Sequence, residues 1–184
     1  NIWQNLGEDA DGDGRTIEGS GNNWYLDPGD LNGIDDDDWD NNSLTYIDDL
    51  IGWDPAGLGG LDDNNPDPPN SSGWAHGTHV AGLLAATTNN SNGIASTAFN
   101  CSIMSVKVSD ENQGSDVYIT DGYDGILYAA KAGFYSQGFS VINNSWGSSS
   151  AITTTSKSYW TVFYSAYINT ISQAVKNDSL LVFA

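Results

Sequence analysis

Two histidines, His76 and His79, lie in a run of small and apolar residues, Gly73–Gly82. The run reads as the start of a helix, and a histidine at such a position suits general-base chemistry. The positive end of the helix dipole disfavours a charged imidazolium and keeps the ring available as a proton acceptor. Gly77 leaves space for a substrate beside the ring. His76 is therefore the candidate general base.

Two other interpretations of the histidines compete with this one. His76 could be a helix-capping histidine that carries no chemistry. The His-x-x-His spacing also allows a metal pair, but zinc sites need further Cys, His or carboxylate ligands, and the Glu of the HExxH pattern is missing. We expect His79 to be a packed structural residue.

The sequence His-Gly-Thr-His-Val-Ala-Gly at His76–Gly82 matches the histidine signature of the subtilases, the subtilisin-like serine proteases, at every position. The resemblance implies that His76 is the catalytic base and that His79 is the second, non-catalytic histidine. It also implies peptide-bond hydrolysis by a Ser-His-Asp triad. A match of this length is more specific than either competing interpretation.

The resemblance extends to two later segments. Residues 114–116 resemble the substrate edge of the family, and residues 141–147 resemble the strand and loop that form a wall of its specificity pocket. Backbone groups of both segments would pair with an extended protein or peptide substrate, as an added strand pairs with a sheet edge. The residues concerned are Gly114, Ser115, Ser145, Trp146 and Gly147.

Two members of the triad have no counterpart in this sequence. The family's catalytic Asp stands in an Asp-Thr/Ser-Gly context, which does not occur here, and no Gly-Thr-Ser-Met-Ala segment supplies the serine. The chain begins at Asn1 without Met and stops at Ala184 inside an apolar run. We therefore expect an internal piece of a catalytic domain, incomplete at both ends and inactive by itself.

Acidic residues crowd the first third of the chain. Overall, 24 Asp and Glu face five Lys and Arg, for a formal net charge of −19. Asp9, Asp11 and Asp13 have the alternating spacing of a calcium loop, and Gly14 allows a sharp turn. An EF-hand would need Glu at its twelfth position, where Ser20 stands, so we expect a loop of another shape.

A second acidic cluster spans Asp30–Asp38, and residues 32–38, 46–49 and 52–54 resemble an insertion seen in some secreted bacterial subtilases. So many carboxylates disfavour a compact state without cations, so we expect structural calcium rather than simple solvated loops. The resemblance adds a possible ligand in the loop after the histidine helix, where an ordinary helix-ending turn is the alternative. The expected ligands are Asp9, Asp11, Asp13, Asp30, Asn32, Asp35, Asp36 and Asn90.

The elements that must position these groups alternate along the chain. Residues 1–70 read as an acidic, loop-rich insertion with one short strand around Ile47–Trp53, and residues 71–184 as an α/β core. The rhythm of the core indicates parallel strands with crossover helices, and the resemblance implies the three-layer α/β fold of subtilisin-like proteins. Predicted core helices and strands are His76–Ala86, Ile103–Val108, Asp116–Ala132, Ser140–Asn144, Tyr159–Lys176 and Leu180–Phe183.

The composition also restricts the partners. The strong negative charge excludes nucleic acid and anionic membranes as partners, and no apolar run is long enough to span a bilayer. We expect a monomer in the full-length form, and the resemblance implies secretion. Cys101 is the only cysteine, and we expect it to be a buried small hydrophobe. A calcium-dependent binding module or a pseudo-protease is the alternative function, but the acidic half that allows it does not explain His76–Gly82.

Overall fold

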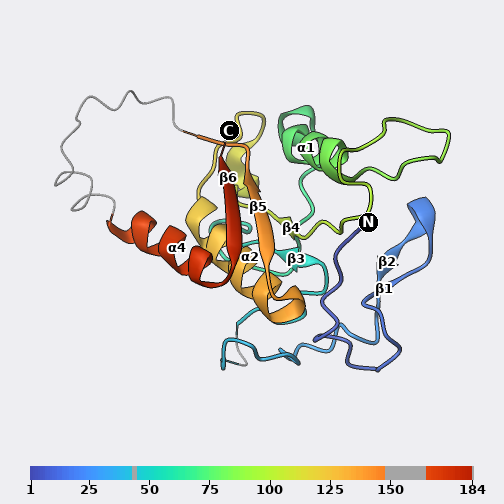
Figure 1. Ribbon diagram of the computed structural model, residues 1–184, viewed down its shortest axis with the longest axis horizontal. Helices are drawn as coiled ribbons and strands as arrows, with labels where there is room; N and C mark the ends of the chain where they lie inside the picture. The colour runs from blue at the N-terminus through green and yellow to red at the C-terminus, as the bar shows by residue number, and fades with distance from the viewer. Residues whose placement is uncertain (43–44, 148–164, 184) are drawn as a thin grey trace. The chain divides into compact units, whose positions relative to one another are not determined.

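The computed structural model describes residues 1–42, 45–147 and 165–183. The chain divides into two compact units, Asn1–Thr120 and Asp121–Ala184. Each unit contains a pair of parallel strands (Figure 1). This division by compactness does not test the predicted boundary at residue 70.

Short strands joined by long loops make up the first unit. β1 (Ile17–Glu18) pairs with β2 (Tyr25–Leu26) in antiparallel fashion. β3 (Gly52–Trp53) pairs in parallel with β4 (Ser105–Val106). The 3-10 turns of this unit are η1 (Gly21–Asn23), η2 (Ser72–Trp74) and η3 (Glu111–Gln113), and its one α-helix among the described residues is α1 (Ala75–Ala85).

The β3–β4 pair depends on a glycine. Gly52 has a φ of 144°, and a Cβ there would overlap the carbonyl oxygen of Ser105, so the two strands can approach this closely only because residue 52 has no side chain. β3 is shorter than the predicted strand Ile47–Trp53. Positive φ angles at Tyr46 and Asp48 bend the chain before it can extend.

Tryptophans form much of the core of the first unit. Trp39 stacks on Tyr46 with ring centroids 4.8 Å apart, and Tyr46 packs edge-on against Trp53 at 5.2 Å. Such aromatic pairs add attraction beyond the area they bury. The buried apolar residues of this unit are Trp3, Trp39, Leu50, Ile51, Trp53, Ala56, Trp74 and Ala85.

A buried ion pair follows the two parallel strands. Lys107 Nζ lies 2.7 Å from Asp54 Oδ2 and also contacts Glu111. Burial opposes the charge on Lys107, but its two acidic partners prevail and raise its pKa. Asp54 also accepts the N–H groups of Ala56 and Gly57 at 3.0 and 2.9 Å, which closes the turn after β3.

In the second unit, two helices and two strands surround a small apolar core. α2 (Gly122–Gln137) and α4 (Ser165–Lys176) pack against the parallel strands β5 (Ser140–Asn144) and β6 (Ser179–Phe183), as Figure 1 shows. β5 has its predicted bounds, β6 begins one residue earlier than predicted, and their pairing is parallel, as expected. The core consists of Ile126, Ala130 and Ala174, with Tyr123, Ile142, Trp146 and Leu181 packed against it.

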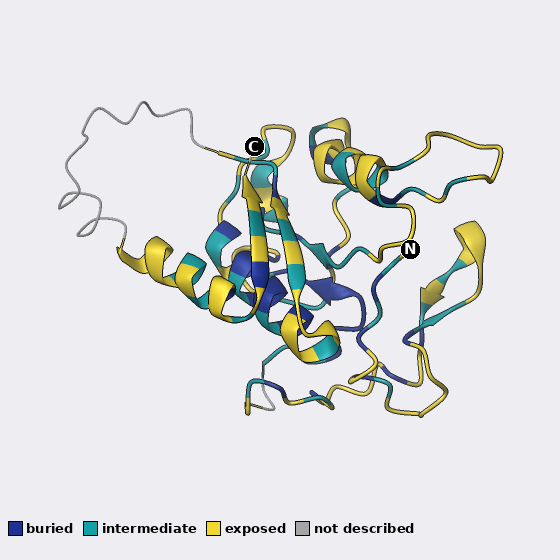
Figure 2. Cartoon of the chain, viewed as in Figure 1, coloured by how far each residue is buried: buried dark blue, intermediate teal, exposed yellow. Residues whose placement is uncertain are grey.

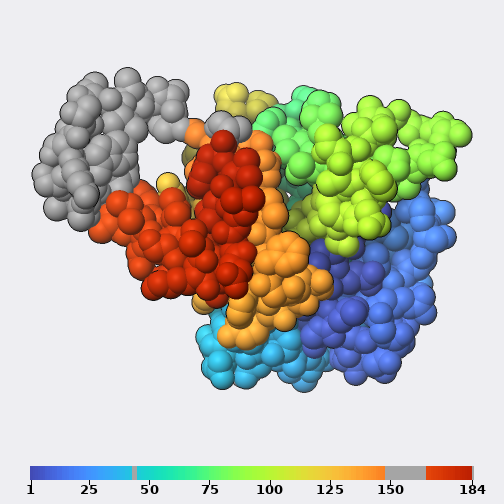
Figure 3. All heavy atoms as spheres, viewed as in Figure 1, coloured from blue at the N-terminus to red at the C-terminus, as the bar shows by residue number. Residues whose placement is uncertain are grey.

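One face of the β5–β6 pair is exposed. Val141 pairs with Leu180, and Asn143 pairs with Val182. Val141, Leu180 and Val182 are exposed, and the alternation of exposed and half-buried residues is visible in Figure 2. In Figure 3, β6 forms part of the visible surface.

The predicted helix Asp116–Ala132 begins six residues before α2, which starts at Gly122. The chain instead keeps a loop up to Thr120, whose N–H donates to the Val108 carbonyl at 2.9 Å. α2 then ends at Gln137, and the following Gly138 adopts the left-handed conformation and donates its N–H to the Phe134 carbonyl at 2.8 Å. Gly is the usual residue at such a helix end.

Two further expectations can be compared with the structure. Cys101 is exposed, which corrects the expectation that it is buried. The first part of the predicted helix Tyr159–Lys176 lies outside the described residues. Among the described helices, none has both the length and the apolar character needed to cross a membrane.

Replacing Lys107 by Met is expected to destabilise the protein by about 3–5 kcal/mol, because it leaves Asp54 buried without its cation. The double variant Lys107→Met/Asp54→Asn should recover part of this loss, since Asn keeps an oxygen for the N–H groups of Ala56 and Gly57. Chemical denaturation measures both values. Lys176→Met, at the exposed end of α4, is the matched control, and an equal loss in that variant would contradict the assigned role of the pair.

Candidate active site and acidic loops

The histidine helix begins directly after the 3-10 turn η2. Trp74 ends that turn, and α1 starts at Ala75, so His76 lies in the first helical turn, as expected from the sequence. The His76 side chain is exposed and makes no hydrogen bond with any residue in the described ranges. A ring in this position is reachable by a substrate or by a neighbouring catalytic group.

The turn before the helix is fastened to the segment Gly114–Ser115. The buried Trp74 donates its indole N–H to the Gly114 carbonyl oxygen at 2.9 Å. Gly73 lies against the same segment, since a Cβ there would be 2.5 Å from the Ser115 carbonyl oxygen. The start of the histidine helix and the predicted peptide-binding segment are therefore neighbours within the first unit.

His79 follows His76 by three positions along α1. It lines a cavity of about 450 Å³ together with Trp74, Thr78 and Gly82, on the helix face next to Pro68 and Pro69. His76 is not among the residues that line this cavity. His79 is exposed, which corrects the expectation of a packed residue.

Ser145, Trp146 and Gly147 follow the carboxyl end of β5 in the second unit. Ser145 accepts a hydrogen bond from the Asn143 side chain at 2.8 Å. Trp146 is half-buried and packs edge-on against Tyr123, with ring centroids 5.8 Å apart. Functional groups of parallel sheets gather beyond this end of the strands.

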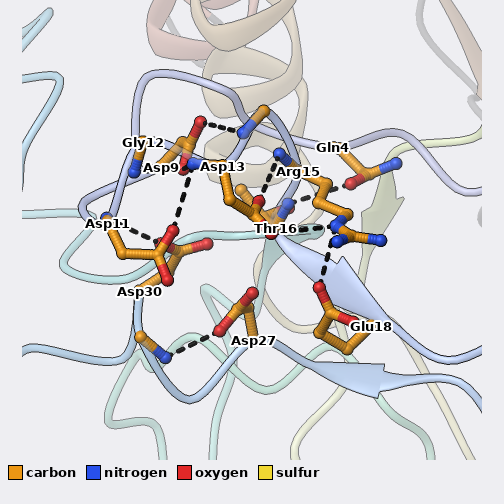
Figure 4. Close-up of polar contacts among 12 residues, drawn as sticks. Gln4, Asp9, Asp11, Gly12, Asp13, Arg15, Thr16, Glu18, Asp27 and Asp30 are labelled. Atoms are coloured by element: carbon orange, nitrogen blue, oxygen red, sulfur yellow. Dashed lines mark hydrogen bonds and ion pairs between the residues drawn. The ribbon is translucent and has the colours of Figure 1, made fainter.

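The first acidic loop brings three predicted calcium ligands together. One carboxylate oxygen each of Asp9, Asp11 and Asp13 lies within 4.8 Å of the others. Asp9 already accepts the N–H groups of Gly12, Asp13 and Gly14, at 2.9, 3.1 and 2.8 Å. Figure 4 shows Asp9, Asp11, Gly12 and Asp13 gathered in this loop.

A basic residue occupies part of the same loop. Arg15 pairs with Asp13 at 3.0 Å and with Glu18 at 2.8 Å, as Figure 4 shows. These two carboxylates therefore have a cation from the chain itself. Asp27, which belongs to a second acidic group with Asp13 and Glu18, accepts the Gly29 N–H at 2.7 Å.

Asp30 is hydrogen-bonded to the backbone of the first acidic loop. Its Oδ1 accepts the N–H groups of Ala10 and Asp11 at 2.9 and 3.4 Å, and the residue is fully buried. Burial raises the pKa of Asp30, and the two N–H groups counteract this. The other oxygen, Oδ2, has no hydrogen-bond partner among the described residues.

The remaining predicted ligands do not form one group. Asn32 donates its side-chain N–H to Asp36 at 2.6 Å. Asp35 instead lies in a group with Glu8 and Asp37, neither of which is among the expected ligands. Glu8 and Asp37 come from separate loops, so no local spacing pattern could have found them together.

Asn90 lies in the exposed loop after α1. Its side-chain oxygen accepts the Asn92 N–H at 3.1 Å, and Asn89, Ser91 and Gly93 all have positive φ angles. This geometry accounts for the Asn and Gly content by turn formation. A calcium ligand at Asn90 stays a prediction.

A family model described as the subtilase family, a peptidase family, matches residues 58–184. The match covers more than half of the chain and includes the histidine helix and both predicted peptide-binding segments. The chain belongs to the subtilase family. Membership implies a three-layer α/β fold, with which the parallel strand pairs of both units are compatible.

Curated relatives of the subtilase chain are proteases. Thermitase of Thermoactinomyces vulgaris is 51% identical over 78 residues, 41% of this chain and 26% of thermitase. The extracellular basic protease of Dichelobacter nodosus is 39% identical over 94 residues, 50% of this chain and 14% of that protein.

A third relative, the extracellular protease of Xanthomonas campestris pv. campestris, is 44% identical over 63 residues, 34% of this chain and 10% of that protein. The chain thus spans about a quarter or less of the length of these relatives. Comparison with solved structures gave no significant match.

Gly73→Ala is expected to destabilise the subtilase chain by about 1–3 kcal/mol, because the new methyl group would press on the Ser115 carbonyl. Gly82→Ala is the matched control, since a Cβ there meets nothing within 4 Å and alanine favours a helix. We expect this control to be neutral or stabilising by up to about 1 kcal/mol. The stability of both variants is measured by thermal unfolding. Equal effects of the two substitutions would contradict the close contact between Gly73 and Ser115.

Proposed function

We propose that these residues are the part of an extracellular subtilisin-like serine endopeptidase that carries its catalytic histidine. The observation that carries the proposal is the exposed His76 in the first turn of α1, inside the complete signature His76–Gly82. The family match over residues 58–184 supports it. The names of two of the relatives, an extracellular basic protease and an extracellular protease, support the location.

In the proposed reaction, His76 acts first as a base and then as an acid. Its imidazole takes the proton of a serine hydroxyl while the serine oxygen attacks the peptide carbonyl carbon. The imidazolium then gives this proton to the amine that leaves when the peptide bond breaks. The serine, and the aspartate that orients the ring, come from outside these 184 residues, so the isolated chain is inactive.

The substrate is a protein or peptide in extended conformation. Gly114 and Ser115 support this part of the proposal, because Trp74 and Gly73 hold them beside the start of the histidine helix. Ser145, Trp146 and Gly147 form the second proposed segment, at the carboxyl end of β5. Backbone groups of an extended peptide would pair with both segments.

Calcium is proposed as a structural cofactor of the acidic loops. The oxygen-rich donor set fits a hard cation, and the unpartnered Oδ2 of the buried Asp30 fits a group that requires a positive charge nearby. Calcium would neutralise carboxylates there and take no part in the proton transfers. The residues proposed to hold it are Asp9, Asp11, Asp13, Asp30, Asn32, Asp35, Asp36 and Asn90.

His76→Ala in the whole protein is expected to lower kcat for peptide hydrolysis by at least about 10⁴-fold, because no group remains to accept the serine proton. His79→Gln is the matched control and should change kcat much less. The assay is release of a chromogenic group from a peptide substrate. Comparable losses in both variants, together with inhibition by a zinc chelator, would instead favour the His-x-x-His metal pair.

The isolated 184-residue chain is expected to show no serine-type peptidase turnover and no labelling by a fluorophosphonate probe, since both reactions need the nucleophilic serine. The whole protein should show both. Steady hydrolysis by the purified chain, abolished when the same probe labels that chain, would overturn the assignment of the serine to another part of the protein.

A further inference from the structure

Glu8 is a buried acid with an unpartnered oxygen. The residue is 0% exposed. Its Oε1 accepts the N–H groups of Asp36 and Asp37 at 3.1 and 3.2 Å. Its Oε2 is buried and has no hydrogen-bond partner among the described residues. A carboxylate oxygen in this state is costly unless a proton or a cation accompanies it.

Two more carboxylates face this group. One oxygen each of Glu8, Asp35 and Asp37 lies within 4.8 Å of the others. Asp35 is 5% exposed, so the cluster is largely closed to solvent screening. Burial and the neighbouring acids raise the pKa of Glu8 to about 8, although the N–H of Asp37 counteracts this. The surroundings of Glu8 therefore favour a proton or a cation on its carboxyl group.

No salt bridge recorded within the described ranges neutralises the cluster. Those salt bridges use Arg15 for Asp13 and Glu18, and Lys107 for Asp54 and Glu111. None of them involves a member of the group around Glu8. The missing positive charge must come from bound protons or from an ion.

The surrounding chain holds the three groups in place. The buried Asn5 donates its side-chain N–H to Asp37 Oδ2 at 2.9 Å and also to Asp49. Gly7 lies so close to Asp37 that a Cβ at residue 7 would overlap the Asp37 side chain. The turn Asn5–Glu8 and the loop that contains Asp37 are therefore in contact at these carboxylates.

We infer that Glu8, Asp35 and Asp37 are the carboxylate ligands of a calcium ion that joins the turn Asn5–Glu8 to the loop Asp35–Trp39. Calcium binds oxygen ligands in flexible geometry, which suits carboxylates from separate loops, whereas zinc prefers nitrogen and sulfur. The inference deepens the calcium role proposed above, adding Glu8 and Asp37. It does not depend on the peptidase assignment.

The test uses the whole protein in the His76→Ala background, so that self-digestion does not obscure the result. The protein is stripped with a chelator and titrated with CaCl₂. Bound calcium is counted by equilibrium dialysis, and melting temperatures are recorded with and without calcium. The variants are Glu8→Gln and Asp37→Asn, and Asp62→Asn, an exposed acid outside the cluster, is the control.

We expect Glu8→Gln and Asp37→Asn each to bind one calcium ion fewer than the parent and the control. Calcium at about a hundred times its Kd should raise the melting temperature of the parent by about 5–10 °C, and the two variants should lose much of this gain. In chelator, Glu8→Gln should melt no lower than the parent, because Gln keeps an oxygen for the N–H groups of Asp36 and Asp37 and needs no proton or cation.

The inference is overturned if Glu8→Gln and Asp37→Asn bind as many calcium ions as Asp62→Asn. Should Glu8→Gln not fold, Asp37→Asn decides alone, since Asn can still accept the hydrogen bond from Asn5. These readouts are independent of turnover. Failure of the peptidase assignment would appear only as undiminished activity of His76→Ala.

Discussion

Buried carboxylates need a compensating partner, and positive side chains are scarce in this protein, with five Lys and Arg for 24 Asp and Glu. Burial raises the pKa of Asp54 despite the adjacent Lys107, because loss of solvation outweighs the pairing. Many other acids rely on backbone N–H donors: Asp13, Asp40 and Asp63 each accept the N–H of the residue two positions further on. Such bonds favour turns over strands. Accordingly, the strands among the described residues of the acidic region are two residues long, and tryptophans fill much of its core.

Sequence patterns predicted well the elements whose stability is local or strongly apolar. β5 and β6 were predicted within one residue because their apolar runs are bounded by Gly138 and Asp178, both with positive φ. The histidine helix was predicted from one signature. The start of α2 was missed because Thr120 is held by a hydrogen bond to Val108, a contact outside any local window.

The candidate sites show the same limit. The spacing of Asp9, Asp11 and Asp13 predicted that their carboxylates would lie close together, because a tight loop leaves side chains two residues apart little room to separate. The group around Glu8 was not predictable, because it depends on Asn5 and Gly7 meeting the loop of Asp37. Contacts between loops that are distant in the sequence depend on packing, and they produce no periodic pattern in the sequence.

The contact between Gly52 and Ser105 also determines the alignment of β3 with β4. The residues flanking Gly52 are Ile51 and Trp53, so a slip by one position in either direction would place a residue with a side chain opposite Ser105. Sheets lacking such a block can slide between registers. The absence of a side chain at Gly52 thus fixes the register of β3 against β4. The same register keeps Lys107 in line with Asp54.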